Sequence, residues 1–204
     1  MDTRRIPLEC ERYYHIYNRG VNGQTIFFEE RNYDFFLRKY AQYVHPFVET
    51  FAYCLLKNHF HFLIRVRSEE EIRQFLNGKK VEKLPFWLVS NAFSSFFQSY
   101  SQAINKRFER TGQLFEEPFH RIDVATEVYF TRLVWYIHHN PQKHGFVSDF
   151  RDYRYSSYWS HLQEKQTKLQ RQEVLARFGN KQEYEKFHLL QQEEKSLKNI
   201  IIEF

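Results

Sequence analysis

Apolar and polar residues alternate along residues 55–67, a pattern that predicts a β-strand with two distinct faces. One face is apolar and is expected to belong to a core; it comprises Leu56, Phe60, Phe62, Ile64 and Val66. The opposite face is not expected to be core; it comprises Leu55, Lys57, His59, His61, Leu63, Arg65 and Arg67. His59 and His61 point the same way on such a strand, with their side chains rooted about 6–7 Å apart. Two imidazoles at this spacing can converge on one cation beside charges suited to a phosphate, although an ordinary pair of surface histidines explains the pattern equally well.

The other periodic segments predict three more strands and three long helices. The strands are expected at 12–19, 47–56 and 114–124, and the helices at 29–44, 87–110 and 126–140. Lys57 and Asn58 are expected to form a tight turn, so the strands on either side of them should be antiparallel. Residues 68–85 are polar and predict a loop with a short helix. In the last long helix, Thr126 is the expected N-cap and Pro141 is expected to end the helix.

The first strand is rich in aromatic residues, and its two faces are less clearly sorted. Gly20 follows it and is expected to stop it. The sequence leaves open whether Tyr14 or His15 faces the histidine pair.

This order of elements predicts an α+β fold, a ferredoxin-like antiparallel sheet with helices packed on it. One domain is expected over residues 1–160. Residues 161–204 are rich in Gln, Glu and Lys and predict a helical C-terminal extension, with amphipathic pieces at 171–178 and 181–190. The order of elements names no function by itself.

Composition narrows the class of protein only modestly. The chain has 30 Lys and Arg against 25 Asp and Glu, and its net charge of +5 would suit a polyanionic partner but is common among soluble proteins. Aromatic residues make up 19% of the chain, enough for a dense core and for surfaces on which bases could stack. Cys10 and Cys54 lie outside any CxxC pair, so neither a disulfide framework nor a thiolate zinc site is expected. Because no apolar run could span a membrane and no signal-peptide core is evident, a soluble, cytoplasmic protein is expected.

A second group of candidate residues lies on the helix expected at 126–140. Tyr136, His139 and Asn140 lie at i, i+3 and i+4, so they are expected to share one face. The amide oxygen of Asn140 is a reasonable third ligand for a hard cation already held by two imidazoles. A tyrosine becomes a useful nucleophile when a neighbouring base or cation favours its phenolate. From helical periodicity alone, however, Tyr136 is better explained as one more ring of the core.

The helix expected at 87–110 ends in a basic group, and Gly112 is expected to stop it. The group comprises Lys106, Arg107 and Arg110. These cations could contact phosphate, but positive charge also suits a helix C-terminus because of the helix dipole, and the two explanations are equally good.

Four segments resemble, in the same order, the REP-associated tyrosine transposases of the HUH superfamily, which act on single-stranded DNA. Residues 57–64 (KNHFHFLI) resemble its motif of two histidines around a hydrophobic residue, and residues 136–147 (YIHHNPQKHGFV) resemble the helix that carries its single tyrosine. Residues 112–119 (GQLFEEPF) and 153–158 (YRYSSY) are similar to its Gly-x-Leu-Phe turn and its aromatic-Ser-Ser-Tyr segment. The resemblance departs at Glu116 and Glu117, which stand where relatives often carry basic residues.

The resemblance implies the HUH transposase fold and a definite chemistry. The protein would be a metal-dependent transposase that cleaves and rejoins single-stranded DNA at hairpin-forming repeats through a 5′-phosphotyrosine intermediate. Tyr136 would be the nucleophile, and His59, His61 and Asn140 would hold a divalent cation, Mg²⁺ or Mn²⁺. The partner would be single-stranded or hairpin DNA, with no membrane, and the protein would be a monomer or a homodimer. The residues expected to contact DNA are Arg65, Arg67, Lys106, Arg107 and Arg110.

Two other functions fit the same sequence. The first is a domesticated, non-catalytic protein whose sheet and basic helix still bind hairpin DNA. The second is a metal-dependent hydrolase that uses His59, His61 and His139 with an activated water. A covalent protein–DNA adduct would distinguish the transposase from both.

Overall fold

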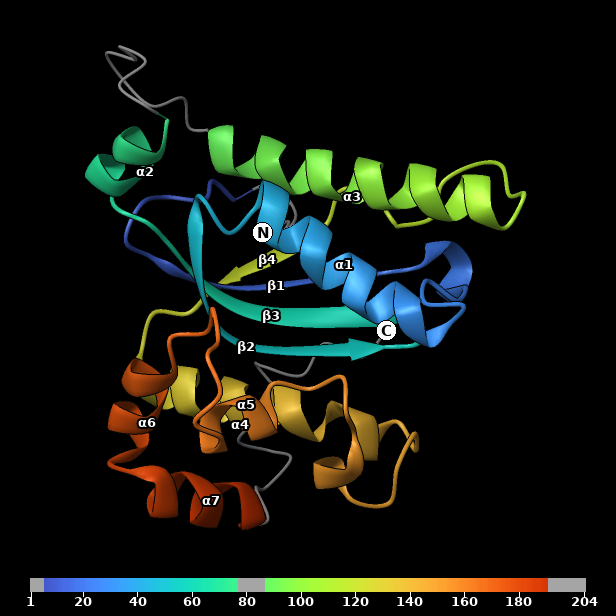
Figure 1. The fold of residues 1–204 in the computed structure, drawn as a ribbon. Coiled ribbons are helices and arrows are strands. Elements are labelled where there is room, and N and C mark those ends of the chain that lie inside the picture. The colour runs from blue at the N-terminus through green and yellow to red at the C-terminus, as the bar shows by residue number, and fades with distance from the viewer. Residues whose placement is uncertain (1–5, 77–86, 191–204) are drawn as a thin grey trace.

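A four-stranded sheet lies at the centre of the molecule, with helices on both of its faces (Figure 1). The computed structural model describes residues 6–76 and 87–190. In chain order the main elements are β1 (Tyr13–Arg19), α1 (Glu30–Tyr43), β2 (Val48–Leu56), β3 (His59–Val66), α2 (Glu69–Phe75), α3 (Leu88–Arg107), β4 (His120–Asp123), α4 (Glu127–Lys143), α5 (Tyr158–Leu162), α6 (Arg171–Phe178) and α7 (Lys181–Leu189). Helices α1 and α3 cover one face of the sheet, and α4 to α7 form the layer over the other (Figure 1).

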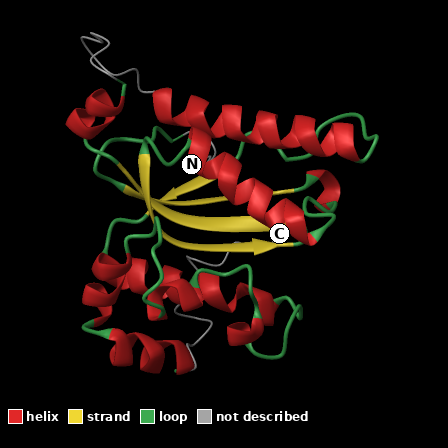
Figure 2. Ribbon diagram, in the orientation of Figure 1, coloured by secondary structure: helices red, strands yellow, loops and turns green. Residues whose placement is uncertain are grey.

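The strand order is β2-β3-β1-β4, and every neighbouring pair is antiparallel, which places β3 and β1 in the middle of the sheet (Figure 1). Figure 2 shows the strands lying between two layers of helices. Helix α1 connects β1 to β2, and α3 lies between β3 and β4. This is the ferredoxin-like α+β arrangement that the sequence predicts. In the register of the two central strands, His61 lies opposite Tyr17 and His59 lies opposite Arg19.

The face under α1 and α3 is covered by an aromatic and aliphatic core. Phe60 and Phe62 of β3 are fully buried in it. Phe36 of α1 lies 5.1 Å from Phe60 between ring centroids, and Tyr40 stacks on Phe62 at 4.4 Å. This is the apolar face that the alternation predicts, and burying each such ring stabilises the fold by about 1.5–3 kcal/mol.

The face under α4 is also buried from His59 to Leu63, so the expectation that it is not core is wrong for this part of the strand. His15, His59 and His61 are 0%, 4% and 1% exposed, respectively. Leu63 of the same face belongs to a second core cluster with residues of α4, α5, α6 and α7. The amphipathic pieces expected at 171–178 and 181–190 are confirmed as α6 and α7, and they belong to this covering layer rather than to a detached tail.

The alternation along residues 55–67 is broken at the turn between β2 and β3. Leu56 was expected on the apolar face but belongs to the core under α4, whereas Leu55 belongs to the core under α1 and α3. Because β2 ends at Leu56 and β3 begins at His59, the period-two pattern restarts after the turn. Leu56 is therefore paired with His59, and cross-strand partners share a face of the sheet.

Helix α4 begins where the sequence predicts and runs further than expected. The hydroxyl of Thr126 accepts a hydrogen bond from the backbone amide of Tyr129 (3.1 Å), which confirms the predicted N-cap. The predicted end at Pro141 is wrong, because the helix continues to Lys143. A proline so near the helix C-terminus removes only one hydrogen bond, and the amide of His144 still donates to the carbonyl of Asn140 (3.0 Å).

The strand expected at 114–124 is confined to the four residues of β4. Before it, Phe115 makes an isolated bridge to Gly20, and Pro118 has no N–H to donate to a ladder. The short helix expected within 68–85 is α2, and the part of that segment from residue 77 onward lies outside the described residues. Within the described ranges, every helix is too short or too polar to cross a lipid bilayer.

Candidate active site

Three histidines meet on the sheet face under α4. The rings of His59 and His61 lie 5.3 Å apart between centroids and are nearly perpendicular. His15, on the neighbouring strand β1, lies beside His61, and its Nε2 is hydrogen-bonded to Nδ1 of His61 at 2.9 Å. Tyr14 instead points into the core under α1 and α3. The question that the sequence leaves open is thus answered in favour of His15.

Burial keeps these three rings neutral. It lowers the pKa of His15 to about 3. It also lowers the pKa of His59 to about 3; the neighbouring His144 acts in the same direction, and the side chain of Asn140 opposes the shift. The pKa of His61 lies well below its ordinary value, first because of burial and then because of the neighbouring histidines. A neutral imidazole keeps a lone pair on one nitrogen, which is the form in which histidine binds metal ions.

Helix α4 places Tyr136 over this group. The side chain of Tyr136 is 3% exposed, and its ring meets His61 edge-on at 5.6 Å and His15 at 6.2 Å between centroids. The ammonium group of Lys143, at the end of the same helix, lies 6.0 Å from the centroid of the Tyr136 ring. Tyr136 is therefore a core ring, as its periodicity indicates, and also a neighbour of the histidines, as the resemblance implies.

Asn140 lies one helical turn beyond Tyr136 and is fully buried. Its Nδ2 donates a hydrogen bond to the backbone carbonyl of Tyr136 (2.9 Å), and its amide interacts with the ring of His59. Its Oδ1 is also buried and accepts no hydrogen bond within 3.5 Å from the residues that the structure describes. A buried amide oxygen in this state, next to an imidazole, is a suitable ligand for a cation.

The donor set suits a divalent cation that takes both nitrogen and oxygen ligands. His59, His61 and Asn140 together supply two imidazoles and one amide oxygen. Within residues 6–76 and 87–190, no three His, Cys, Asp or Glu side chains are grouped so that they could hold a metal ion. A cation at this position would therefore depend on Asn140 and on oxygens from outside the protein to complete its coordination.

His139 points away from the site, contrary to the expectation that it shares a face with Tyr136. Its ring stacks on Trp135 at 4.0 Å and on Phe150 at 3.9 Å, and its Nδ1 lies 3.0 Å from the carbonyl of Trp135. Residues i+3 and i+4 lie on opposite sides of residue i around a helix, and only Asn140 follows Tyr136 toward the sheet. A hydrolase that uses His139 as a third ligand is not supported by this arrangement.

The histidine that does approach the pair is His144. Its ring lies 4.9 Å from that of His59 between centroids, at the C-terminal end of α4. Sequence reasoning missed it because it follows Pro141, where the helix was expected to end. A prediction that the helix continues past Pro141 would have placed His144 one turn after Asn140, near the site.

A row of rings continues from the histidines across the sheet. Tyr17 of β1 lies between His61 and His120 of β4, at 5.9 Å and 4.7 Å between centroids. Beside this row Arg19 forms an ion pair with Glu116 (2.7 Å). The acidic residue that departs from the family pattern thus neutralises a cation close to His59.

The basic residues predicted to contact DNA lie at two different ends of the sheet. Arg65 lies near the far end of β3 and Arg67 just beyond it, about 20 Å and about 26 Å along the strand from His59. Both form ion pairs with Glu49, and Arg67 forms another with Glu71 (3.2 Å). The structure does not bring these two arginines to the histidines, and their role in DNA binding stays a prediction.

The basic group of α3 lies at the same end of the sheet as His59. Arg110 donates to the side chain of Gln24 (2.9 Å), and the Asn58 side chain donates to the carbonyl of the neighbouring Gly23 (3.3 Å). Asn58 in turn is hydrogen-bonded to His59 (2.9 Å). Lys106 and Arg107 are both exposed at this end of α3, although Arg107 also lies 3.7 Å from Glu29.

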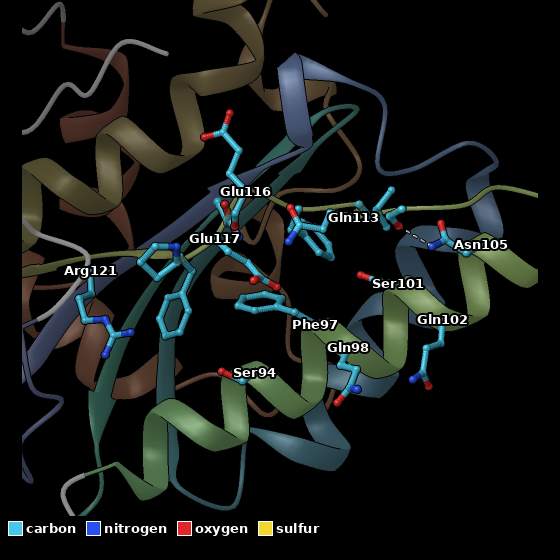
Figure 3. Close-up of a pocket in the computed structure, with 16 residues that line it drawn as sticks. Ser94, Phe97, Gln98, Ser101, Gln102, Asn105, Gln113, Glu116, Glu117 and Arg121 are labelled. Atoms are coloured by element: carbon cyan, nitrogen blue, oxygen red, sulfur yellow. Dashed lines mark hydrogen bonds between the residues drawn. The ribbon is translucent and has the colours of Figure 1, made fainter.

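A hollow of about 700 Å³ lies between α3 and the segment 112–121 (Figure 3). Phe97 and the amide side chains of Gln98, Gln102 and Asn105 line it from the helix, with Glu116 and Glu117 on the other side. Neither the histidine pair nor Tyr136 is among its lining residues, so it is separate from the candidate active site.

Comparison with solved structures shows which known fold this chain resembles. No family model matches the chain, and no curated protein does. Among solved structures, a REP-associated tyrosine transposase bound to a REP hairpin is similar to this chain, with a TM-score of 0.59 and 14% sequence identity. The match covers 79% of this chain and 86% of the other. The chain therefore has the α+β fold of that transposase, as its sequence motifs predict.

Proposed function

We propose that this protein is a metal-dependent transposase that cleaves and rejoins single-stranded DNA at hairpin-forming repeats through a tyrosine. The observation that carries the proposal is the placement of Tyr136 against His61, with Asn140 one helical turn further along α4. The solved relative of the same fold is described as a transposase bound to a hairpin, which supports the substrate class. The 5′ linkage to the tyrosine is what the resemblance to the transposases implies, and the chemistry of these side chains is compatible with it.

The reaction is a transesterification. The phenolic oxygen of Tyr136 attacks the scissile phosphorus, the bond from phosphorus to the 3′ oxygen breaks, and the 5′ end stays attached to Tyr136 as a phosphotyrosine. The 3′ oxygen leaves as a hydroxyl, which balances the proton that the tyrosine gives up. Because one ester replaces another, no nucleoside triphosphate is needed, and the sequence has no Walker-type Gly-Lys-Ser/Thr loop. A later attack by a free 3′-hydroxyl rejoins the DNA.

The side chains around Tyr136 have separable roles. The ammonium group of Lys143, 6.0 Å from the centroid of the Tyr136 ring, would place positive charge beside the nucleophile. His59, His61 and Asn140 would hold Mg²⁺ or Mn²⁺, which would supply positive charge at the scissile phosphate. The basic group of α3, at the same end of the sheet, is suited to the DNA backbone.

The experiment is to incubate the protein with hairpin DNA that carries single-stranded flanks and to look for an adduct that survives denaturation. We expect an adduct with Mn²⁺ or Mg²⁺ and none in EDTA. Tyr136→Phe should abolish the adduct, by at least about 10³-fold in rate, while DNA binding and thermal stability persist. Tyr129→Phe is the matched control, because it removes a second hydroxyl from α4, one whose pKa is raised to about 12 mainly by burial.

Other outcomes would point to the alternative functions. Hairpin binding without an adduct in the wild-type protein would favour a non-catalytic DNA-binding protein. Metal-dependent cleavage with free 5′ and 3′ ends, undiminished in Tyr136→Phe, would favour a hydrolase. An adduct that persists in Tyr136→Phe would contradict the assignment of the nucleophile.

A further inference from the structure

We propose that His15 is a positioning residue that holds the imidazole of His61 so that its Nε2 faces the cation. The inference rests on the proposed function, because it concerns a residue behind one of the three proposed ligands. It goes beyond that proposal by giving a role to a side chain on a different strand, outside the motif of the two histidines.

The hydrogen bond between the two rings fixes which nitrogen of His61 can act as a ligand. Nε2 of His15 lies 2.9 Å from Nδ1 of His61. A neutral imidazole carries one N–H, so when His61 donates its Nδ1–H to His15, its Nε2 carries the lone pair. Histidines that bind metals commonly have their second ring nitrogen held in this way, which sets both the tautomer and the orientation of the ring.

The complete burial of His15 indicates that this position requires a polar side chain. The side chain is 0% exposed, and its own Nδ1 makes no hydrogen bond within 3.5 Å to the described residues. An apolar side chain would avoid this cost of burying an incompletely satisfied polar group. The ring of His15 contacts Tyr17, at 4.8 Å between centroids, as well as His61, at 5.1 Å, and Tyr136, at 6.2 Å.

A second histidine pair under α4 offers a contrast. Nδ1 of His138 is hydrogen-bonded to Nε2 of His188 on α7 (2.9 Å), as in the pair formed by His15 and His61. The remaining nitrogen of His138, however, is hydrogen-bonded to Ser157 (2.8 Å). Both ring nitrogens of His138 are therefore used within the protein, which is the arrangement expected of a purely structural pair. His188 is on this ground a matched control for His15.

The test compares four variants of the full chain: His15→Phe, His15→Gln, His15→Asn and His188→Phe. The amide of Gln reaches the position of Nε2 and can accept the proton from His61, whereas the amide of Asn reaches only the position of Nδ1. Mn²⁺ affinity is measured by electron paramagnetic resonance in the absence of DNA. The tautomer of His61 is read with Mg²⁺ from the ¹⁵N shifts of its ring in labelled protein.

We expect His15→Phe and His15→Asn to weaken Mn²⁺ binding by about 10- to 100-fold. Both should also lose the Nδ1–H form of His61. His15→Gln should restore most of the affinity and the tautomer, and His188→Phe should change neither.

Equal Mn²⁺ affinity in the wild type and all three His15 variants would overturn the inference and leave the proposed function intact. Rescue by Asn rather than Gln would also overturn it. If the wild type binds no Mn²⁺ at all, the proposed metal fails first, and the role of His15 fails with it. Should His15→Phe not fold, the comparison of His15→Gln with His15→Asn decides the matter alone.

Discussion

Both faces of strand β3 are covered by helices, but different kinds of side chain fill the two interfaces. Under α1 and α3, Phe60 and Phe62 pack against other rings in a cluster of aromatic and aliphatic side chains. Under α4, the same strand contributes His59 and His61, both nearly fully buried. A core of hydrocarbon needs only the right volume, whereas a core that holds polar groups needs a partner for each of them. The second face therefore contributes less to the stability of the fold, which is common at functional sites.

The helices over the second face add to the same contrast. Besides the three histidines of the sheet, the layer formed by α4, α5 and α7 buries His138, His161 and His188. Burial lowers the pKa of His161 and of His188 to about 3. The half of the molecule under α4 should thus respond to pH more strongly than the half under α1 and α3, and it alone should respond to cations. Four measurements test this difference, beginning with the largest expected effect.

Phe62→Ala should destabilise the protein most, by about 3–5 kcal/mol, because it leaves a cavity among the rings of the apolar core. The loss should be the same with and without Mn²⁺. Denaturant unfolding at pH 7.5 in both conditions measures it. A loss that depends on the cation would mean that the two faces are not separate.

His61→Ala should cost less, about 1–3 kcal/mol, because it leaves the buried nitrogen of His15 without its partner. In contrast to Phe62→Ala, it should also abolish both Mn²⁺ binding and adduct formation. The same unfolding experiment, together with a metal titration, gives both quantities. Undiminished cation-dependent cleavage in His61→Ala would contradict the proposed ligand set.

Acid should destabilise the α4 side through its neutral histidines. Between pH 6.5 and about 3, His161 and His188 bind protons in the unfolded chain but not in the folded protein, where they are buried. Their contribution to the free energy of unfolding is therefore complete above pH 6.5 and decreases as the pH falls below that value. Each such histidine contributes about 1.4 kcal/mol per pH unit in this window. His161→Gln should reduce the slope between pH 6.5 and 5 by about one proton, measured by denaturant unfolding at several pH values. An unchanged slope would show that His161 is not held neutral.

Replacing single basic residues should have the smallest effect. Lys106→Ala should weaken hairpin binding modestly and reduce the dependence of log Kd on log salt by about 1, because one phosphate contact is lost. Arg67→Ala is the matched control, since Arg67 is engaged with Glu49 and Glu71 at the other end of the sheet. Fluorescence anisotropy across a salt series measures both. A larger loss for Arg67 than for Lys106 would place the DNA at the opposite end of the sheet.

The sequence predicts the sheet and its apolar face well, because period-two alternation is a local property of β3. It fails at Leu56 and Pro141, where a turn restarts the alternation and a helix continues through a proline. The burial of His59 and His61 could not be predicted from their strand, because the cover comes from helices far along the chain. For the same reason His15 stayed ambiguous, since a hydrogen bond between strands has no signature within either one.

The site itself divides in the same way. Helical spacing predicts that Asn140 lies near Tyr136, but it predicts the same for His139. Only the packing of His139 against Phe150 shows that His139 points away from the site. No sequence pattern predicts that His144 lies at the site, apart from the continuation of α4 past Pro141. The resemblance to the transposases suggested the reaction. The structure places Tyr136 and Asn140 of α4 beside His59 and His61 of β3.

The most direct test of the central claim is to identify the residue that becomes linked to DNA. The adduct formed with hairpin DNA and Mn²⁺ is digested with nuclease and trypsin, and the modified peptide is sequenced by mass spectrometry. The account predicts a nucleotide attached through its 5′ phosphate to Tyr136. A nucleotide on Tyr129, Tyr17 or any other residue would contradict it.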